Sequence, residues 1–528
     1  MLLFSRISPN ADTKLRLSTK LIIAVCLLAS GAMQTFALAP FDYWLLGPIS
    51  ISLCLIITNA LAPRDQNNYG FIYGGLFGLG LFGSGASWIY VSIHTYGYAS
   101  PALAAILTLA FVLLLSAFPA FIFWLYFKLS SATEHKHQHV KNALLFLCLW
   151  VAGDALRTEV LTGFPWLFLG YGHLESPLSG WIPVLGVYGI TFITVATGIS
   201  IALFFTQASK SLKVSTVVLL SLIWLAGPAL KQIEWSKNTN KELSVALVQL
   251  NIPQELKWQP AQRRKTLKLL DKLTREYWHN DLIIWPETAV PLLYDQAQPF
   301  LKKMSALASA HDSNIISGIP FRGKNKETGQ TVVHNSITSI GAGSGLYHKQ
   351  KLVPFGEYVP LQEVLRGLIA FFDLPMSDFR KGPKNQALLK SQDYQTAPFI
   401  CYEVVYPDFV ASNAIGADYL LTISNDSWFG ESLGPLQHLE MAQMRAAENA
   451  RFMIRATNNG ISAIIDEQGK IISSTEQFVK TVHESKIQIR SGRTPFSYTG
   501  SYPLFILCFA FILWRLFRCY FFKTNKVS

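Results

Sequence analysis

Residues 281–287 read Asp-Leu-Ile-Ile-Trp-Pro-Glu, a short apolar run that ends in a carboxylate. Such a run, closed by proline, is typical of a buried β-strand. Further strands are expected at 243–250, 314–320, 333–341, 397–403 and 418–425, with helices at 263–278 and 437–456 and a hairpin at 462–475. The alternation of strands and helices predicts an α/β domain over residues 240–495.

The chain as a whole is too apolar for a soluble protein. Of its 528 residues, 50% are hydrophobic and 15% are charged, whereas soluble domains carry about 25% charged residues. Apolar runs of about 20 residues, enough to cross a bilayer, lie near 20–39, 44–62, 70–91, 101–127, 142–160, 182–206, 213–231 and 503–521. We expect seven spans within residues 1–235 and one more at 503–521.

Basic residues indicate the orientation of these spans. Lys and Arg occur before the first span and in the second, fourth and sixth connections, represented by Arg64, Lys136 and Lys210, but not in the first, third or fifth. By the positive-inside rule, both termini are expected in the cytoplasm and residues 240–495 in the periplasm. These loops also explain the net charge of +12, so no nucleic-acid partner is expected.

Three polar residues in the α/β segment could carry chemistry. Glu287 closes one strand, Lys349 lies in 347–360, and Cys401 is the only cysteine outside the apolar runs. A thiol can attack a carbonyl, a carboxylate can take its proton, and an ammonium can stabilise the oxyanion. Each could instead be a solvated or core residue. On a strand, Lys351 would face the same side as Lys349, so spacing does not choose between them.

The surrounding motifs resemble a known superfamily. WPE at 285–287, K-x-x-LVPFGE at 349–357, CYE at 401–403 and SNDSWFG at 424–430 are similar to the nitrilase, or carbon–nitrogen hydrolase, superfamily. A domain of this kind that follows seven membrane spans and precedes an eighth resembles the apolipoprotein N-acyltransferase family. Further matches are NIPQ at 251–254, GFPW at 163–166 and R-x-x-NNG at 455–460, whereas Leu250 stands where glycine is expected.

The resemblance implies a four-layer α-β-β-α sandwich and a triad of Glu287, Lys349 and Cys401. It selects Lys349 over Lys351. Residues expected to support the triad or bind substrate are Glu357, Glu403, Tyr402, Trp258, Phe429 and Asn425. Glu403 is expected to orient Lys349 and the substrate amine.

The resemblance also implies the reaction. Cys401 takes an acyl chain from a membrane phospholipid as a thioester and passes it to the α-amine of a diacylated apolipoprotein, by ping-pong catalysis. No metal or other cofactor is expected. The implied setting is the bacterial inner membrane, and the expected oligomeric state is a monomer.

An apolar stripe with helical spacing follows the motif at 349–357 and comprises Leu361, Leu365, Leu368 and Phe372. It is either a core helix or a mobile arm that dips into the membrane interface and covers the acyl groove. Its place directly after the Lys349 motif favours the arm.

Other functions fit parts of the sequence. A membrane-tethered nitrilase-type amidohydrolase is the main alternative. A serine esterase is suggested by the elbow pattern at 430–434, with Ser432 followed by Asp466 and His483, although the preceding strand ends near Asn425. A transporter could use Asp154 and Arg157, which could equally pair on one helix.

The glycine pattern at 78–83 matches a dinucleotide fingerprint but is better explained by helix packing.

Overall fold

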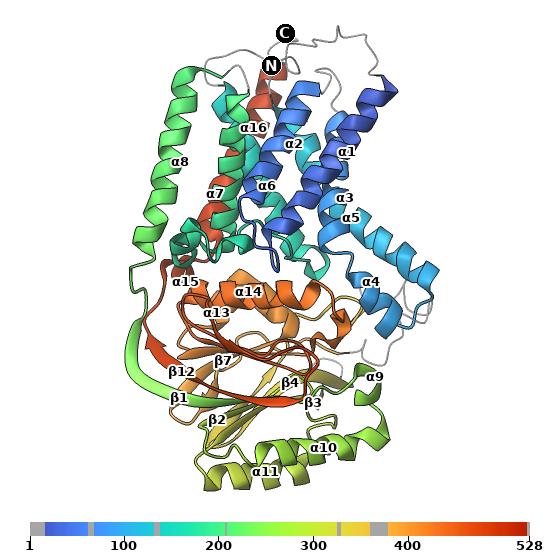
Figure 1. Ribbon diagram of the computed structural model, residues 1–528, viewed down its shortest axis with the longest axis vertical. Coiled ribbons are helices and arrows are strands. Elements are labelled where there is room, and N and C mark those ends of the chain that lie inside the picture. Colours follow the sequence, from blue (N-terminus) through green and yellow to red (C-terminus); the bar gives the residue numbers. More distant parts are fainter. Residues whose placement is uncertain are drawn as a thin grey trace.

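The computed structural model describes residues 16–61, 68–130, 138–205, 208–324, 329–359 and 379–524. A helical bundle stands on a domain built around a large β-sheet, and both ends of the described chain lie at the far end of the bundle (Figure 1). The expected arm at 361–372 lies outside the described residues.

The sheet has twelve strands in the order β11-β10-β9-β8-β7-β6-β5-β4-β3-β2-β1-β12. Their bounds are β1 (Lys237–Gln249), β2 (Leu282–Trp285), β3 (Asn314–Lys324), β4 (Thr331–Gly341), β5 (Gly343–His348), β6 (Leu389–Ser391), β7 (Tyr394–Ile400), β8 (Tyr419–Ser424), β9 (Met453–Thr457), β10 (Ala463–Ile465), β11 (Ile471–Ser474) and β12 (Thr481–Ser491). Strands β1, β2 and β3 are parallel, as are β7, β8 and β9. Strand β5 pairs with both β4 and β6 and thus joins two halves of the sheet.

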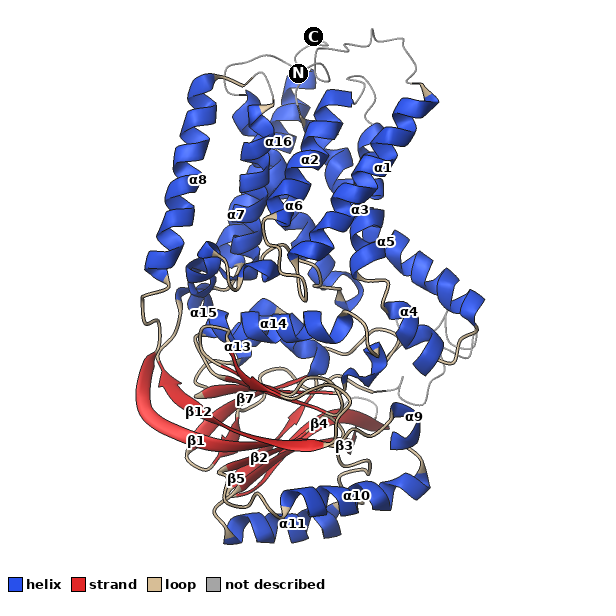
Figure 2. Ribbon diagram, viewed as in Figure 1, coloured by secondary structure: helices blue, strands red, loops and turns tan. Residues whose placement is uncertain are grey.

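The two halves face each other across one apolar core. Leu247 and Ile316 of the first half belong to the same buried cluster as Leu421 and Ile454 of the second. Helices α10 (Pro260–Thr274) and α11 (Gln298–Ala310) cover the outside of the first half, and α13 (Pro407–Asn413) and α14 (Gly434–Asn449) cover the second (Figure 2). The expected α-β-β-α sandwich is therefore present.

Several predicted elements ended in the wrong place: the helix expected over 263–278 ends at Thr274, the strand expected over 314–320 continues to Lys324, and two further cases have clear causes. The helix expected over 437–456 ends at Asn449, and Ala450 turns the chain with a φ of 46° before strand β9 begins at Met453. A buried parallel strand is apolar on both faces, so its run cannot be distinguished from a continuing helix by periodicity. The strand expected over 397–403 ends at Ile400, because Cys401 starts a 3₁₀ turn, Cys401–Val405.

Each apolar run expected to span a membrane contains a helix. The bundle comprises α1 (Leu17–Met33), α2 (Leu46–Leu61), α3 (Asn68–Gly85), α4 (Ile89–Val91), α5 (Pro101–Leu129), α6 (Gln138–Glu159), α7 (Ile182–Phe204), α8 (Lys210–Leu230) and α16 (Tyr502–Thr524). Within the described residues, five helices are long and apolar enough to cross a membrane, or six if the bent pair Tyr69–Gly85 and Ile89–Tyr96 is one span. Helix α2 is short in its apolar part, and α6 carries Asp154 and Arg157.

The glycine pattern at 78–83 lies in helix α3 and serves helix packing. A Cβ at Gly74 or Gly78 would lie within 3 Å of atoms of Pro119 in α5, and one at Gly80 would lie 2.0 Å from the Leu28 carbonyl oxygen in α1. Only glycine permits these close approaches. The dinucleotide interpretation is wrong because residues 68–77, directly before the pattern, belong to helix α3 and form no strand.

Helix α14 lies between the sheet and the bundle and bonds to both (Figure 1). The Gln437 side-chain oxygen accepts hydrogen bonds from the indole nitrogens of Trp88 and Trp166, at 3.1 and 3.0 Å. Glu448 accepts the backbone N–H of Val187, which follows a break in α7 at Gly186. These buried contacts fix the sandwich against the end of the bundle.

Candidate active site

The three expected catalytic residues each follow a strand and meet in one cavity. Glu287 follows β2, Lys349 follows β5 and Cys401 follows β7; their exposed fractions are 7%, 1% and 9%. All three line a cavity of about 860 Å³.

Lys349, not Lys351, faces this cavity. The Lys349 Nζ lies 2.8 Å from Glu357 Oε2 and 3.6 Å from Glu287 Oε1. The Lys351 ammonium lies 3.7 Å from Glu159 and over the ring of Tyr406. The expectation that both lysines face one side was wrong, because they lie in a loop after β5, where strand alternation does not apply.

Two carboxylates and one amide hold the lysine in place. Asn335 Nδ2 donates to Glu287 Oε1 at 2.7 Å and to Glu357 Oε1 at 2.9 Å. Burial alone would lower the pKa of Lys349, but the carboxylates of Glu357 and Glu287 raise it above its ordinary value. Lys349 is therefore a fixed cation. Asn335 was missed from the sequence, because it lies inside strand β4 and does not close an apolar run as Glu287 does.

The Cys401 thiol is neutral at rest. Burial and the Glu287 carboxylate raise its pKa to about 12, against the opposing effect of Lys349. Since a thiolate is the attacking species, the thiol must lose its proton as it reacts. Of the two cavity-lining carboxylates in the described chain, Glu287 and Glu357, it is Glu287 whose charge acts on the thiol, so Glu287 is the candidate base.

Alkylation of Cys401 by iodoacetamide should therefore keep accelerating with pH. A group whose pKa is raised gains thiolate only toward that higher pKa, so the rate should rise about tenfold per pH unit from about pH 7 to 10. Peptide mass spectrometry across this range measures the rate. A plateau below about pH 8 would instead indicate a preformed thiolate paired with Lys349.

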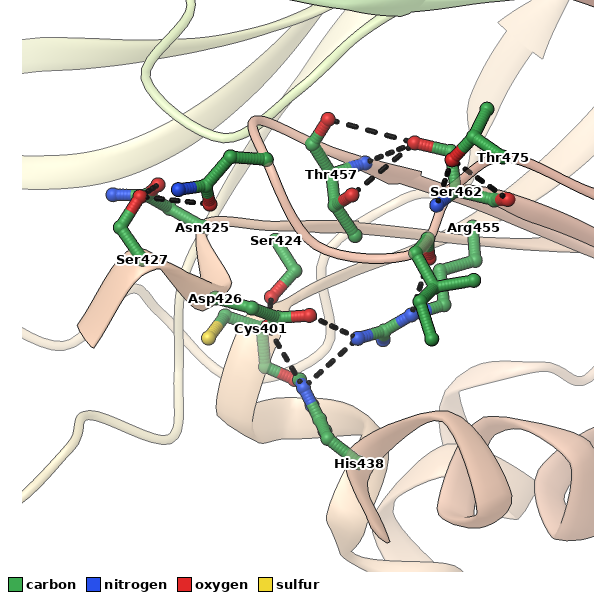
Figure 3. Close-up of polar contacts among 12 residues, drawn as sticks. Cys401, Ser424, Asn425, Asp426, Ser427, His438, Arg455, Thr457, Ser462 and Thr475 are labelled. Atoms are coloured by element: carbon green, nitrogen blue, oxygen red, sulfur yellow. Dashed lines mark hydrogen bonds and ion pairs between the residues drawn. The ribbon is translucent and has the colours of Figure 1, made fainter. Parts of the chain in front are cut away.

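A buried polar network supports the backbone of Cys401 (Figure 3). His438 Nε2 lies 3.2 Å from the Cys401 carbonyl oxygen, and Arg455 Nη2 lies 3.1 Å from His438 Nδ1 and 2.6 Å from Asp426 Oδ2. A carbonyl only accepts, so Nε2 carries the proton and donates. Burial and Arg455 lower the pKa of His438, against the opposing effect of Asp426, whose Oδ1 lies 3.1 Å from Nδ1. A neutral ring lets Nδ1 accept from Arg455.

This network holds Cys401 in an unusual conformation. The φ of Cys401 is 50°, in the left-handed region that residues other than glycine rarely adopt. Ser424 Oγ completes the network by donating to Asp426 Oδ1 at 2.6 Å. Asp426 and Arg455 lay within motifs noted in the sequence, whereas no pattern pointed to His438.

Glu403 orients the chain that carries Lys349. Its fully buried carboxylate accepts hydrogen bonds from the backbone N–H groups of Ile400, Gln350 and Lys351 and from the Tyr347 hydroxyl. Burial raises the pKa of Glu403 to about 7, although these N–H donors oppose the shift. The carboxylate thus connects the Cys401 turn to the Lys349 loop, and it is not part of the cavity wall formed by the described residues.

The other expected residues divide into two groups. Tyr402, Asn425 and Phe429 line the cavity. The Tyr402 hydroxyl donates to the Gly163 carbonyl, and its ring stacks on Trp166. Trp258 lies between α9 (Gln254–Lys257) and α10 and is not among the described residues that line the cavity. Its neighbour Lys257, missed from the sequence, donates to the Glu287 carbonyl at 2.9 Å.

The motif at 163–166 is held in place by a buried ion pair. Arg157 Nη2 lies 2.8 Å from Asp154 Oδ1, and Arg157 Nη1 donates to the carbonyls of Phe164 and Trp166. Trp166 and Phe164 in turn line the cavity. Asp154 and Arg157 thus pair with each other, as their spacing allowed, and support the wall of the site.

Apolar side chains of the bundle form most of the remaining wall. They come from α5, α6 and α16 and include Leu107, Phe111, Leu114, Phe118, Leu149, Leu156 and Phe509. The cavity therefore joins the polar side chains of Glu287, Lys349 and Cys401 to a space lined by apolar side chains of the bundle.

The serine-esterase residues have other contacts. Ser432 Oγ accepts the Gly434 N–H, and Asp466 accepts the N–H groups of Gln468 and Lys470 in the β10–β11 hairpin. Neither lines the cavity. Among the described residues, no three His, Cys, Asp or Glu side chains are placed to hold a metal ion.

An α-β-β-α sandwich with a carboxylate, an ammonium and a thiol at its strand ends defines a protein of the carbon–nitrogen hydrolase class. The family model described as "Carbon-nitrogen hydrolase" matches residues 244–494, and that described as "Apolipoprotein N-acyltransferase N-terminal domain" matches residues 30–200.

Two relatives match the chain over almost its full length. Apolipoprotein N-acyltransferase of Pseudomonas syringae pv. tomato is 45% identical, covering 94% of this chain and 97% of its own. That of Pseudomonas aeruginosa PAO1 is 46% identical, covering 93% and 94%. The chain belongs to the apolipoprotein N-acyltransferase family.

Solved structures similar to the chain are more distant. The Saccharomyces cerevisiae Nit3 protein of the nitrilase superfamily has a TM-score of 0.35 at 18% identity, covering 48% of this chain and 92% of its own. The Caenorhabditis elegans NitFhit protein has a TM-score of 0.36 at 15% identity, covering 47% and 61%.

Proposed function

We propose that this chain moves an acyl chain from a membrane phospholipid to the α-amine of the N-terminal diacylglyceryl cysteine of an apolipoprotein, through a thioester at Cys401. The observation that carries the proposal is the single cavity in which Glu287, Lys349 and Cys401 meet an apolar wall from the bundle. A hydrolase of small amides would need no such wall.

The first half-reaction loads Cys401. Glu287 takes the thiol proton while sulfur attacks the ester carbonyl of the phospholipid, and Lys349 stabilises the resulting oxyanion. The tetrahedral intermediate collapses with cleavage of the ester C–O bond. Glu287 then returns the proton to the departing lysophospholipid, which leaves the acyl chain on sulfur.

The second half-reaction transfers the acyl chain from Cys401 to the acceptor. The acceptor amine attacks the thioester carbonyl and gives a proton to Glu287, and Lys349 again faces the oxyanion. The C–S bond breaks, sulfur regains its proton from Glu287, and the product is an amide. Because the same base and cation act twice, no cofactor is required.

A bulky residue in the apolar wall should slow long-chain donors selectively. Ala110 lines the cavity on α5, and Ala110→Trp would exclude about two methylene groups, each worth about 0.8 kcal/mol, or about 15-fold in rate. Acylation by a long-chain phospholipid should fall by this factor, while a short-chain activated ester should be affected less than about twofold.

Leu109→Trp is the matched control, since Leu109 is 55% exposed and is not among the cavity-lining residues. Initial rates of thioester formation with both donors give the comparison. Equal slowing of both donors by Ala110→Trp would mean that the wall does not hold the acyl chain.

The direct test of the proposal is intact-mass analysis after incubation with phospholipid alone. The expected result is a mass increase of one acyl chain on Cys401, which disappears when a diacylated lipopeptide is added and appears on its amine. Turnover of simple amides without a stable acyl adduct would instead favour a membrane-tethered amidohydrolase.

The proposed setting follows from the charge pattern. We infer seven spans within residues 1–235, with α2 and α6 counted among them, a catalytic domain at 240–495 and a span at 503–521. Lys and Arg on alternate connections favour cytoplasmic termini and a periplasmic catalytic domain in a bacterial inner membrane. Mature lipoprotein N-termini would emerge on that side, and a monomer suffices because one chain supplies the triad.

A further inference from the structure

A second pocket lies where the sandwich meets the bundle, away from the active site. It has a volume of about 290 Å³ and is lined by the ends of α13, α14 and β12 and by α15 (Pro495–Thr499). None of its lining residues lines the active-site cavity. We call it the basic pocket, because Arg451, Arg490 and Arg493 all line it.

Positive charge exceeds negative charge in the basic pocket. Arg490 is paired with Glu467 at 3.1 Å. Within the described chain, Arg451 and Arg493 have no carboxylate at ion-pair distance, and Arg451 donates to the carbonyls of Ala417, Ala450 and Gly492. Burial lowers the pKa of Arg451, and Arg490 and Arg493 lower it further against Asp418. Such a cluster favours an anion.

Two hydrogen-bond acceptors also line the basic pocket. Asn449 is 3% exposed, and its Oδ1 has no hydrogen-bond partner, while its Nδ2 donates to the Arg445 carbonyl. A buried acceptor without a donor is unfavourable, so a ligand that supplies one is favoured here. The Asp418 carboxylate also lines the pocket and accepts the Gln395 N–H. A fitting ligand therefore combines an anionic group with an N–H or O–H donor.

The position of the basic pocket indicates where such a ligand comes from. Helix α15 leads directly into α16, one of the helices able to cross a membrane, and the adjoining surface exposes Ile415, Tyr498 and Tyr502 at 53%, 67% and 64%. Exposed tyrosines beside a membrane helix are typical of the level of the lipid headgroups. Helix α15 lies at the junction of the bundle and the sandwich (Figure 1).

We propose that the basic pocket binds the headgroup of a phospholipid in the adjacent leaflet, with the phosphate on Arg451 and Arg493 and a headgroup N–H or O–H donating to Asn449 or Asp418. This lipid would anchor the sandwich against the membrane surface. It is distinct from the acyl donor, because it lies outside the active-site cavity.

The test is photolabelling of the full-length protein in phosphatidylcholine nanodiscs. A photoactivatable phosphatidylethanolamine should label residues 411–418 and 490–498 about tenfold more than the matching phosphatidylcholine, which lacks an N–H donor. Arg493→Gln should reduce this labelling about tenfold, and Arg493→Lys should reduce it less. Lys486→Gln is the control, since it removes one positive charge from β12, outside the basic pocket, at a side chain 69% exposed.

Labelling requires no acyl transfer, so its outcome is independent of the chemistry at Cys401. Equal labelling by both lipids, or equal labelling of Arg493→Gln and Lys486→Gln, would overturn the proposal. Loss of labelling in excess inorganic phosphate would also overturn it, by identifying a site for free phosphate.

Discussion

Replacing Cys401 with serine should abolish acyl transfer, by a factor on the order of 10⁴ or more, as expected when an enzyme loses its nucleophile. Serine keeps the size of the side chain but is far less ionised than a thiol. Glu287 would have to remove a much less acidic proton in a cavity where burial already raises the pKa of the native thiol to about 12. The measurements are thioester formation by intact mass and transfer to a diacylated lipopeptide.

The fold should survive this change. The network that holds residue 401 acts on its backbone carbonyl through His438, a contact that serine leaves in place. The unfolding temperature in detergent should therefore match that of Cys26→Ser, a control at a cysteine in α1. Near-normal transfer by Cys401→Ser would refute the proposed nucleophile.

Local pattern was sufficient to predict most of the sandwich. Apolar runs closed by Gly, Pro or polar residues identified strands such as β2 and β8, and the hairpin turns at Gly469, whose φ is 83°. The pattern failed where a helix and a buried strand follow each other with little polar sequence between them, as at Ala450. There the left-handed turn, and not hydrophobicity, ends the helix.

Strand-end position made Glu287 and Cys401 candidates, because a polar residue that closes an apolar strand lies at the end of the sheet, and the resemblance to the family then selected them. The residues that orient them were harder to find. His438 acts through a neutral ring whose role depends on Arg455 from another element, and Asn335 bridges two carboxylates that are 70 positions apart in the sequence. Such contacts arise from the packing of the two sheet halves and leave no local pattern.

Replacing Lys349 with methionine should have the largest effect on stability of any single change in the site. Lys349 is 1% exposed and balances the carboxylates of Glu287 and Glu357, so its removal leaves buried negative charge without a partner. Breaking a buried pair in this way typically costs about 3–5 kcal/mol. Acylation of Cys401 should be lost as well, since the ammonium proposed to stabilise the oxyanion is gone.

Lys351→Met is the control that shows whether the losses are specific to Lys349 or follow the removal of any nearby positive charge. Lys351 is 25% exposed, and its partner Glu159 is 71% exposed at 3.7 Å, so the pair should contribute at most about 1 kcal/mol. Denaturant unfolding in detergent should distinguish the two variants clearly. Normal acylation in Lys349→Met together with loss in Lys351→Met would reverse the assignment of the catalytic lysine.

A double variant, Lys349→Met with Glu357→Gln, distinguishes folding from catalysis at this position. Neutralising Glu357 removes the carboxylate closest to the missing ammonium, at 2.8 Å, and leaves Glu287 with its hydrogen bond from Asn335. Much of the lost stability should return, because less uncompensated charge is buried. Acylation should not return, because the oxyanion still lacks a cation. Recovery of both would mean that Lys349 contributes only to the fold, and recovery of stability alone would support its proposed role in the reaction.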